Sequence, residues 1–361
     1  MPVQLPVKNE SETKGVAPLV GTLSPSIVDM IPLKLVMLLA SPYLAGQTCD
    51  EAIKKAHQVY KENRFTATID ILGEDARADE DCQRFAAAYK DVIDAVASLP
   101  IPCSRSSEQI TVSFKPSMFS TIVPTESAPD KDRRLSEAYD RIKGVVDYAL
   151  KHNIRMTMEA EDYRWADFQL DAYTSLINAG YSNVGTVLQT RLFRVKSDLK
   201  RFDERSRVRL VIGIYNEPAE LAYTEKPIMK ELLVDYALEL AQRGTYLEIG
   251  SHDGDCINKF IKQVAIPLRL SASQFEVQHL MGVPRLELQQ GLVSGKYFVQ
   301  MSEEASGGIH DYLSDLARTG VMVRLYLPFG KDHVAAPYCK RRLKANPHMI
   351  SYGIKNLLHL K

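Results

Sequence analysis

The amino-acid sequence predicts a (β/α)₈ barrel preceded by an N-terminal helical arm. Eight short β-rich runs alternate with longer amphipathic helical patterns, which is typical of consecutive right-handed βαβ units and a parallel sheet. Eight such units are the number that closes a barrel. The alternative is a doubly wound open sheet, but no GxGxxG or GxxxxGKS motif follows any of the runs. That absence weakens an open sheet with a dinucleotide site.

Composition favours a protein that acts on a small molecule. Of 361 residues, 45% are hydrophobic, and Lys+Arg and Asp+Glu both number 45. A chain of this size can bury a large core, and its balanced charge gives no overall field to attract nucleic acid. The five cysteines form no CxxC pair, as expected for free thiols in a reducing compartment. We therefore expect a cytoplasmic protein with no nucleic-acid partner.

Two segments are expected before the barrel: a disordered leader over residues 1–25 and a helical arm over residues 26–63. Thr48 and Glu51 have the spacing of a capping box at the start of a helix. The apolar stretch 27–45 is too interrupted to span a membrane and fits a short docking helix. The interrupting residues are Asp29, Pro32, Lys34 and Pro42.

The catalytic barrel is expected over residues 64–361. Amphipathic helices are predicted between most of its strands, for example over 135–149 and over 232–240, where Gly244 follows as a stop signal. The predicted strands are, in order, TATIDIL, ITVSFK, IRMTMEA, NVGTVLQ, VRLVIGIY, TYLEIGSH, FEVQHLMG and VMVRLYLP.

One connection is too long for an ordinary strand-to-strand helix. It runs from Pro284 to Gly320, and we interpret about 284–318 as an insertion. Within it, GLVSGKYFV is predicted to form a small β-hairpin.

Polar residues stand at the C-terminal ends of the predicted strands, where barrel enzymes carry their chemistry. We expect these side chains to converge on one pocket. They are Lys115, Glu159, Gln189, Tyr215, His252, Gln278 and Tyr326.

A basic pair follows the last strand, in the run Tyr338-Cys-Lys-Arg-Arg-Leu. Asp332 and Pro337 are candidate start signals for the helix that carries it. Arg341 and Arg342 would point about 100° apart, so both could contact one anion lying between them, such as a substrate carboxylate. Lys115 could supply a third cation. The alternative is that these are solvated charges on a helix surface and at a strand end.

Further polar and aromatic residues at the strand ends suit other parts of a ligand. One group could offer hydrogen bonds to a polar heterocycle and a diphosphate, with structural capping as the alternative. Tyr326 and Tyr215 could form an aromatic wall around an apolar ring, or simply pack in the barrel. The hydrogen-bonding group consists of Gln189, Arg194, Arg209 and the triplet Ser251-His252-Asp253.

A metal centre is the other chemistry considered. Barrel hydrolases place histidine and acidic ligands at strand ends. The sequence has no HxH or HExxH pair, so we predict no metal site. The candidate ligands are His152, His252, His279 and Glu159.

Taken together, these segments resemble the proline dehydrogenase family, in order from about Tyr43 to the end of the chain. The interval from Tyr326 to the pair Arg341 and Arg342 matches the family's tyrosine-to-arginine-pair interval. The other matching motifs are IDILGED, VSFK, VGTVLQTRLFR, RLVIGIY, SHD, FEVQHLMG, RLYLPFG and YCKRRL.

The resemblance implies an FAD-dependent enzyme of proline catabolism. In the family, L-proline is oxidised to 1-pyrroline-5-carboxylate, with hydride passing from substrate C5 to flavin N5 and electrons continuing to a quinone. It implies that Lys115, Arg341 and Arg342 hold the carboxylate, and that Tyr326, Tyr215 and Leu280 surround the ring. The residues implied to contact FAD are Gln189, Arg209, Val211, Gly213, Ser251 and His252.

Several departures from the family pattern leave the exact substrate and the rate open. Thr157 replaces an acid, Ile212 and Ile214 replace lysine and alanine, and Ala345 replaces a glutamate near the cofactor. The alternatives are a family member that oxidises another cyclic or N-alkyl amino acid, and a catalytically weak proline-binding regulator. Tyr326 favours proline over hydroxyproline. Quinone use would suit peripheral contact with the inner face of a membrane, through 27–45 or the insertion.

Overall fold

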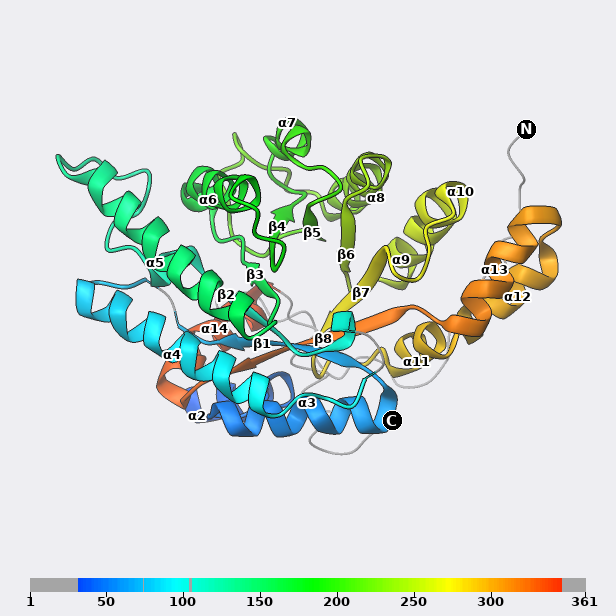
Figure 1. Cartoon of the computed structure of the whole chain (residues 1–361), viewed down its shortest axis with the longest axis horizontal. Helices are drawn as coiled ribbons and strands as arrows, with labels where there is room; N and C mark the ends of the chain where they lie inside the picture. Colours follow the sequence, from blue (N-terminus) through cyan, green and yellow to red (C-terminus); the bar gives the residue numbers. More distant parts are fainter. Residues whose placement is uncertain (1–31, 74, 104–105, 346–361) are drawn as a thin grey trace.

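Eight parallel strands close into a barrel in sequence order, with β8 paired to β1 (Figure 1). The computed structural model describes residues 32–73, 75–103 and 106–345. All eight predicted strands are confirmed, and the open-sheet alternative is wrong. Their bounds are β1 Thr66–Ile71, β2 Thr111–Phe114, β3 Met156–Met158, β4 Val184–Gln189, β5 Arg207–Val211, β6 Tyr246–Gly250, β7 Phe275–Leu280 and β8 Met322–Phe329.

Helices surround the barrel and account for most of the connections between strands (Figure 1). Short 3-10 turns occur after some strands, including η3 (Pro116–Met118) after β2. The helices are α2 Leu33–Ala40, α3 Cys49–Asn63, α4 Asp79–Ser98, α5 Lys131–Lys151, α6 Ala166–Asn178, α7 Val195–Asp198, α8 Lys226–Gln242, α9 Gly254–Phe260, α10 Ile266–Leu268, α11 Leu286–Ser294, α12 Lys296–Glu304, α13 Gly307–Thr319 and α14 Asp332–Ala345.

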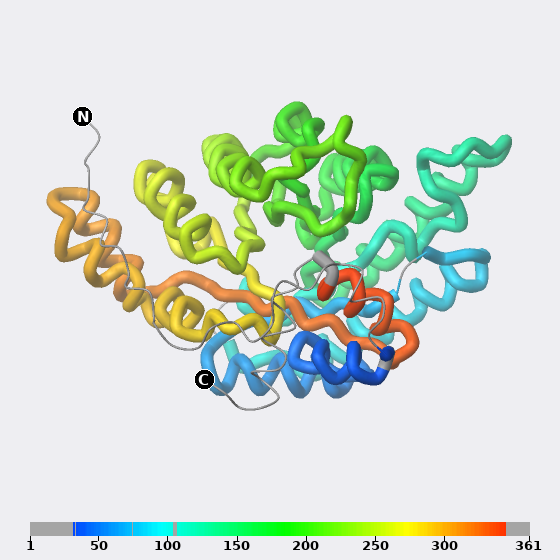
Figure 2. Tube along the Cα trace, turned by 180° about the vertical axis from the view of Figure 1, so that it is seen from behind, coloured from blue at the N-terminus to red at the C-terminus, as the bar shows by residue number. Residues whose placement is uncertain are grey.

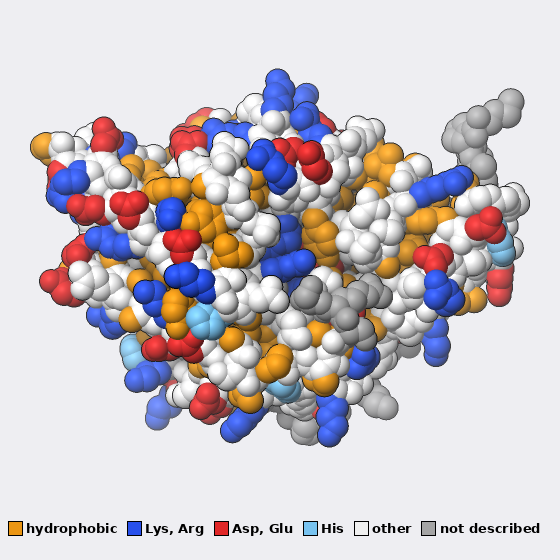
Figure 3. All heavy atoms as spheres, in the orientation of Figure 1, with side chains coloured by type: hydrophobic (Ala, Val, Ile, Leu, Met, Phe, Trp, Pro, Cys, Tyr) orange, Lys and Arg blue, Asp and Glu red, His pale blue; other side chains and the backbone are white. Residues whose placement is uncertain are grey.

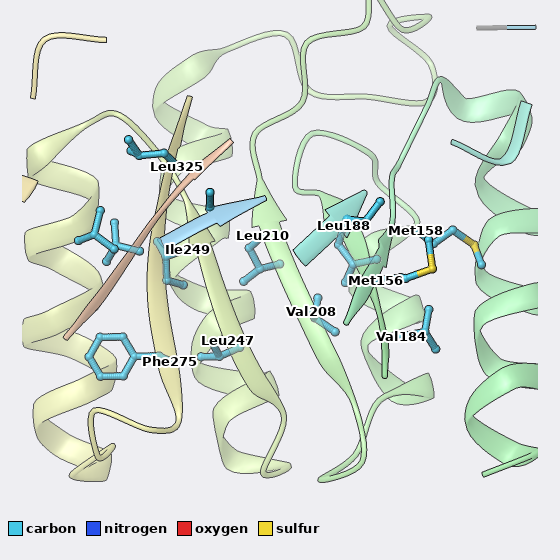
Figure 4. Close-up of a cluster of buried hydrophobic side chains, with 14 of the residues drawn as sticks. Met156, Met158, Val184, Leu188, Val208, Leu210, Leu247, Ile249, Phe275 and Leu325 are labelled. Atoms are coloured by element: carbon cyan, nitrogen blue, oxygen red, sulfur yellow. The ribbon is translucent and has the colours of Figure 1, made fainter. Parts of the chain in front are cut away.

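The main hydrophobic core lies between the strands and the surrounding helices. Successive strand residues point to opposite faces of a sheet, and in β5 and β6 the buried apolar positions alternate with charged or polar ones. Val208 and Leu210, with Leu247 and Ile249, belong to this core (Figure 4). The amphipathic helices supply its other half, because their apolar stripes face the sheet.

The inside of the barrel is polar and contains buried ion pairs. Arg324 on β8 pairs with Glu276 on β7 at 2.7 Å, and its side chain is 3% exposed. Arg207 on β5 pairs with Glu248 on β6 and reaches Thr157 on β3 at 3.2 Å. Bonds between strands that are not neighbours run through the barrel interior. These charges are therefore held by one another rather than by water.

The N-terminal arm is partly described. The capping box of Thr48 and Glu51 is confirmed at the start of α3. The apolar stretch contains α2, whose side chains contact α14, and the two helices lie side by side (Figure 2). The leader predicted over 1–25 lies outside the described residues. Among the described helices, none is long and apolar enough to cross a membrane.

Two local predictions are wrong. The segment GLVSGKYFV forms no hairpin: it contains the end of α11, Gly295 and the start of α12. Gly295 turns the chain between the two helices with φ of 78°, a conformation that glycine adopts without steric cost. Pro337 does not begin the last helix, which starts at Asp332 and carries Pro337 in its interior.

Candidate functional site

Helix α14 packs with α2 next to the end of β8 and forms a second hydrophobic cluster. Leu280 ends β7 and is buried in this cluster, and Tyr326 of β8 packs against it. Tyr338 and Leu343 bring α14 into the same cluster. Two of the residues expected around an apolar ring, Leu280 and Tyr326, therefore lie at one place near the C-terminal ends of the strands.

Lys115 follows β2 and is buried against the carboxylate of Asp70 on β1. Its Nζ lies 3.0 Å from Asp70 Oδ2 and 3.3 Å from Oδ1. Burial alone would lower the pKa of Lys115, but the facing charge of Asp70 outweighs it, and the pKa is raised. Burial raises the pKa of Asp70, against the opposing effect of Lys115. Lys115 is thus a buried ammonium group, and the solvated alternative is wrong for it.

Tyr326 connects this pair to Arg209. The guanidinium carbon of Arg209 lies 5.5 Å from the centre of the Tyr326 ring, a cation–π arrangement. Burial keeps the pKa of Asp70 raised, and hydrogen bonding from Tyr326 opposes that rise in part. Burial, followed by the charges of Asp70 and Glu159, raises the pKa of Tyr326 well above its usual value. The phenol is therefore a neutral donor at any physiological pH.

Arg209 is buried between two carboxylates. Its Nη1 donates to Glu159 Oε1 at 2.5 Å, and its Nε lies 3.3 Å from Glu248 Oε2. Within the described part of the chain, its buried Nη2 has no hydrogen-bond partner. A buried donor without a partner costs free energy unless a ligand or water meets it. Arg209 Nη2 therefore keeps its N–H donors available for a ligand.

The arginine pair of α14 is half-buried rather than solvated. The guanidinium carbon of Arg342 lies 5.3 Å from the centre of the Tyr338 ring. Its Nε is buried and meets no hydrogen-bond partner among the described residues. Burial lowers the pKa of Arg342, but Tyr338 and Tyr326 outweigh this effect, and Tyr215 adds to theirs. Arg342 is therefore close to the tyrosines expected around the ligand. In the view of Figure 3, Lys and Arg side chains gather near the centre of the molecular face.

The chain segments that follow β4 and β5 pack closely against each other. Gly213 has φ of 90°, and a Cβ there would lie 2.7 Å from Gln189 Oε1 and 2.9 Å from Arg191 Cδ. Gln189 is held in place because its Nε2 donates to the carbonyl of Glu161 at 2.6 Å. Only glycine, which has no Cβ and adopts positive φ without steric cost, allows these side chains to lie so close to the backbone. Val211, the last residue of β5, lies just before this close contact.

The triplet after β6 divides into a structural part and a part that faces a neighbouring histidine. Asp253 caps α9 by accepting from the amides of Asp255 and Cys256, and Ser251 Oγ accepts from the Asp253 amide at 3.2 Å. The rings of His252 and His279 stack with centres 5.4 Å apart. The capping alternative is therefore correct for Asp253.

Both histidines are neutral. Burial, with the neighbouring His279, lowers the pKa of His252 to about 3, and burial lowers that of His279 to about 4. Leu280 N donates to His252 Nε2 at 3.4 Å. In the described residues, His252 Nδ1 and both ring nitrogens of His279 are buried without a partner. Each of these imidazoles could donate a hydrogen bond to a ligand or accept one from it.

Other candidates lie apart from this group. Arg194 pairs with Asp198 and Asp167, each at 2.7 Å, so structural pairing is the correct interpretation for it. Glu159 is bound to Arg209, whereas His152 lies 3.3 Å from Asp94. Over the described ranges, no group of three or more His, Cys, Asp or Glu side chains could hold a metal ion.

The positions that depart from the family pattern have different surroundings. Thr157 accepts from Arg207 inside the barrel at 3.2 Å. Ile212 packs against the main core, whereas the Ile214 side chain is 36% exposed. Ala345 ends α14, and its side chain lies outside what the structure describes.

Sequence reasoning assigned no role to several residues of the site, namely Asp70, Glu161, Arg191 and Tyr338. A signal for Asp70 existed, since Thr66, Thr68 and Asp70 alternate along β1 on one face. No comparable signal marked Tyr338, because its place depends on how α14 packs.

The chain is similar to known proteins over most of its length. A family model described as proline dehydrogenase matches residues 52–217. Proline dehydrogenase 1 of Bacillus subtilis subsp. natto is 27% identical over 88% of this chain and 90% of the relative. Proline dehydrogenase of Deinococcus radiodurans is 26% identical over 89% and 90%, respectively.

Solved structures share the fold. Proline utilization A (PutA) from Bdellovibrio bacteriovorus, inactivated by N-propargylglycine, superposes with a TM-score of 0.67 at 22% identity and 85% coverage of this chain. A PutA structure from Bradyrhizobium japonicum gives 0.66 at 18% identity and 88% coverage. The chain spans 32% of the length of each of these two solved chains. The likeness supports the closed (β/α)₈ barrel.

Proposed function

We propose that this chain is a member of the proline dehydrogenase family that oxidises L-proline to 1-pyrroline-5-carboxylate with FAD and passes the electrons to a quinone. This reaction would be the first step of proline catabolism. The observation that carries the proposal is the grouping of buried cations and tyrosines near the C-terminal ends of the strands. An anion with a small apolar ring is the ligand that such a group suits.

In this proposal the substrate carboxylate lies against Lys115, Arg341 and Arg342. Arg342 supports this assignment because its buried Nε lacks a partner among the described residues. Asp70 already balances the charge of Lys115, so the arginine pair would supply most of the net attraction. Leu280, Tyr326 and Tyr215 would border the ring and exclude water from its C5 hydrogen.

The residues expected to hold FAD fit a polar, partly anionic cofactor. Gly213 lets the side chain of Gln189 pack directly against the backbone at the end of β5, and Arg209 and His252 each keep a buried nitrogen free of partners in the described chain. Gln189, Arg209, Val211, Gly213, Ser251 and His252 would contact the cofactor. Bound FAD would supply the acceptor for the hydride leaving substrate C5.

Arg209 would influence the redox step by its charge. A fixed cation near a flavin favours electron density arriving there. Glu159 and Glu248 both contact Arg209, so part of its charge is neutralised before any ligand binds. We expect Arg209 to act mainly through its available Nη2 donor and through its contact with the Tyr326 ring.

The test is a flavin spectrum. Protein purified with FAD is expected to be yellow, and anaerobic L-proline should bleach its flavin absorption band. A colourless protein that cannot be reconstituted with FAD would refute the proposal. Ile214 is partly exposed beside Tyr215, which favours a second candidate: another cyclic or N-alkyl amino acid as substrate. The same assay with a panel of such amino acids ranks them against proline.

Quinone use would bring the protein to a lipid surface, and α2 offers a contact. Leu35 and Leu38 are 44% and 50% exposed on this short helix. An exposed apolar face can bury itself in the interface of a bilayer without spanning it. We expect the double variant Leu35→Ser/Leu38→Ser to co-sediment with quinone-containing lipid vesicles less than the unaltered protein. Equal co-sedimentation would exclude α2 as the contact.

A further inference from the structure

A buried carboxyl group, that of Glu161, is hydrogen-bonded to the turn that follows Lys115. Ser117 belongs to η3, the turn that begins right after Lys115. Glu161 Oε2 accepts from the Ser117 amide at 2.9 Å, and Oε1 accepts from its hydroxyl at 2.6 Å. Glu161 is 6% exposed and Ser117 is 0% exposed. The carboxyl group therefore holds both donors of Ser117, and with them the turn that positions Lys115.

The same pair ties together four consecutive strand ends. Ser117 Oγ accepts from the Asp75 amide at 3.3 Å, and the Ser117 carbonyl accepts from Ala76 at 3.0 Å, which joins the chain after β1. On the other side, the Glu161 carbonyl accepts from Gln189 of β4. A substitution at Glu161 would thus affect hydrogen bonds at the ends of β1, β2, β3 and β4 together.

The charges around Glu161 determine whether it is ionised. Lys115 faces Glu161 from the position just after β2, Asp75 from the chain after β1, and Tyr89 from α4. Burial raises the pKa of Glu161 to about 7, against the lowering effects of Ser117 and Lys115. Both protonation states are therefore accessible near neutral pH. In the ionised state, Lys115 faces Glu161 in addition to Asp70.

We propose that Glu161 is a positioning residue that holds Lys115 in place for a carboxylate ligand. The site binds that carboxylate more tightly when Glu161 is neutral than when it is ionised. This inference rests on the proposed function. A second negative charge beside Lys115 competes with an incoming carboxylate for the same cation. The neutral acid removes that competition and keeps hydrogen bonds to Ser117. Glu161 acts through Lys115 and contacts no substrate itself.

Ligand binding tests the proposal without turnover. The probe is cyclopentanecarboxylate, which has the ring size and carboxylate of proline but no nitrogen to oxidise. Its Kd is measured by calorimetry on the FAD-loaded protein from pH 5.5 to 8.5, for the unaltered chain and for Glu161→Gln. Glutamine can still accept from the Ser117 amide but cannot ionise. We expect the Kd ratio, unaltered to variant, to rise about fivefold across pH 7.

Thermal stability gives a second readout that does not depend on any ligand. An acid whose pKa is raised by folding resists ionisation in the native state, so its native protein loses stability as pH rises from the ordinary value of 4.5 toward 7. The melting temperature of Glu161→Gln minus that of the unaltered protein should therefore increase over this window and level off above it. Glu62→Gln, an exposed carboxyl group on α3, should show no such trend.

Each outcome decides the matter. A Kd ratio and a stability difference that both change with pH support the proposal. A flat Kd ratio overturns it, whether or not stability changes with pH, and so does a failure of the probe to bind at any pH. Absence of proline-dependent flavin bleaching, with a Kd ratio that still rises, would refute the proposed oxidation while leaving this role of Glu161 supported.

Discussion

Replacing Arg342 with methionine is expected to raise the proline concentration for half-maximal flavin reduction by about 100-fold, or about 2.8 kcal/mol. Arg342 is the cation of α14 whose buried Nε has no partner in the described chain, and it lies close to Tyr326 and Tyr338. Methionine keeps an unbranched, apolar stem of similar length. The loss therefore reports the charge and the guanidinium donors. Anaerobic titration of flavin absorbance with proline measures it.

The control for this prediction is Lys331→Met, which removes an exposed cation just before α14. Lys331→Met should keep the proline concentration for half-maximal flavin reduction within about twofold of the unaltered protein's value, because exposed charges contribute little to binding. Arg342→Lys should fall between the two, since lysine retains the charge but not the planar fork. If Arg342→Met binds proline as well as Lys331→Met does, the carboxylate does not lie against Arg342.

Replacing Arg324 with methionine is expected to lower the free energy of unfolding by about 3 to 5 kcal/mol. Arg324 is buried inside the barrel, paired to Glu276 at 2.7 Å. It also donates to three carbonyls, those of Ala67, Gln109 and Ser107. Its removal leaves the three carbonyls without this donor and the buried Glu276 carboxylate without its cation, although neighbouring side chains still donate to that carboxylate. Urea denaturation at a fixed, saturating FAD concentration measures the change.

Arg318→Met is the matched control for Arg324. Arg318 pairs with Asp315 at 2.6 Å on α13, but its side chain is 74% exposed. Its loss should cost less than about 1 kcal/mol. The double variant Arg324→Met/Glu276→Gln should recover part of the stability, because it no longer buries an unpaired charge. Equal destabilisation by the two arginine variants would show that the interior pair contributes no more than a surface pair.

The order of strands was predictable because β-rich runs and amphipathic helices have different periods, and each period is a local property. The errors occurred where local patterns are ambiguous. GLVSGKYFV alternates weakly and contains glycines, which suits a hairpin as well as two helices joined at Gly295. Pro337 is tolerated inside α14, although proline is more common in the first turn of a helix.

The candidate site was predictable only in part, and for a physical reason. Parallel strands in a barrel bring their C-terminal ends together whatever their sequence separation, so Lys115 and Tyr326 could be grouped in advance. The residues that change the charge and position of Lys115 and Tyr326 could not be identified in advance. Asp70 reduces the net charge of Lys115, and Glu161 holds the turn after it. Those contacts depend on side-chain directions at adjacent strand ends.

By itself, the sequence predicted the barrel class, the eight strands and the resemblance to the proline dehydrogenase family, because periodicity and motif order are written along the chain. The tertiary structure alone decided which charged side chains are paired within the protein and which remain available to bind a ligand. It paired Arg194 with two carboxylates, one exposed and one buried, and it buried Arg209 between Glu159 and Glu248. It also placed Arg342 beside the tyrosines. Charge in a protein interior acts through burial and distance, and both exist only once the chain has folded.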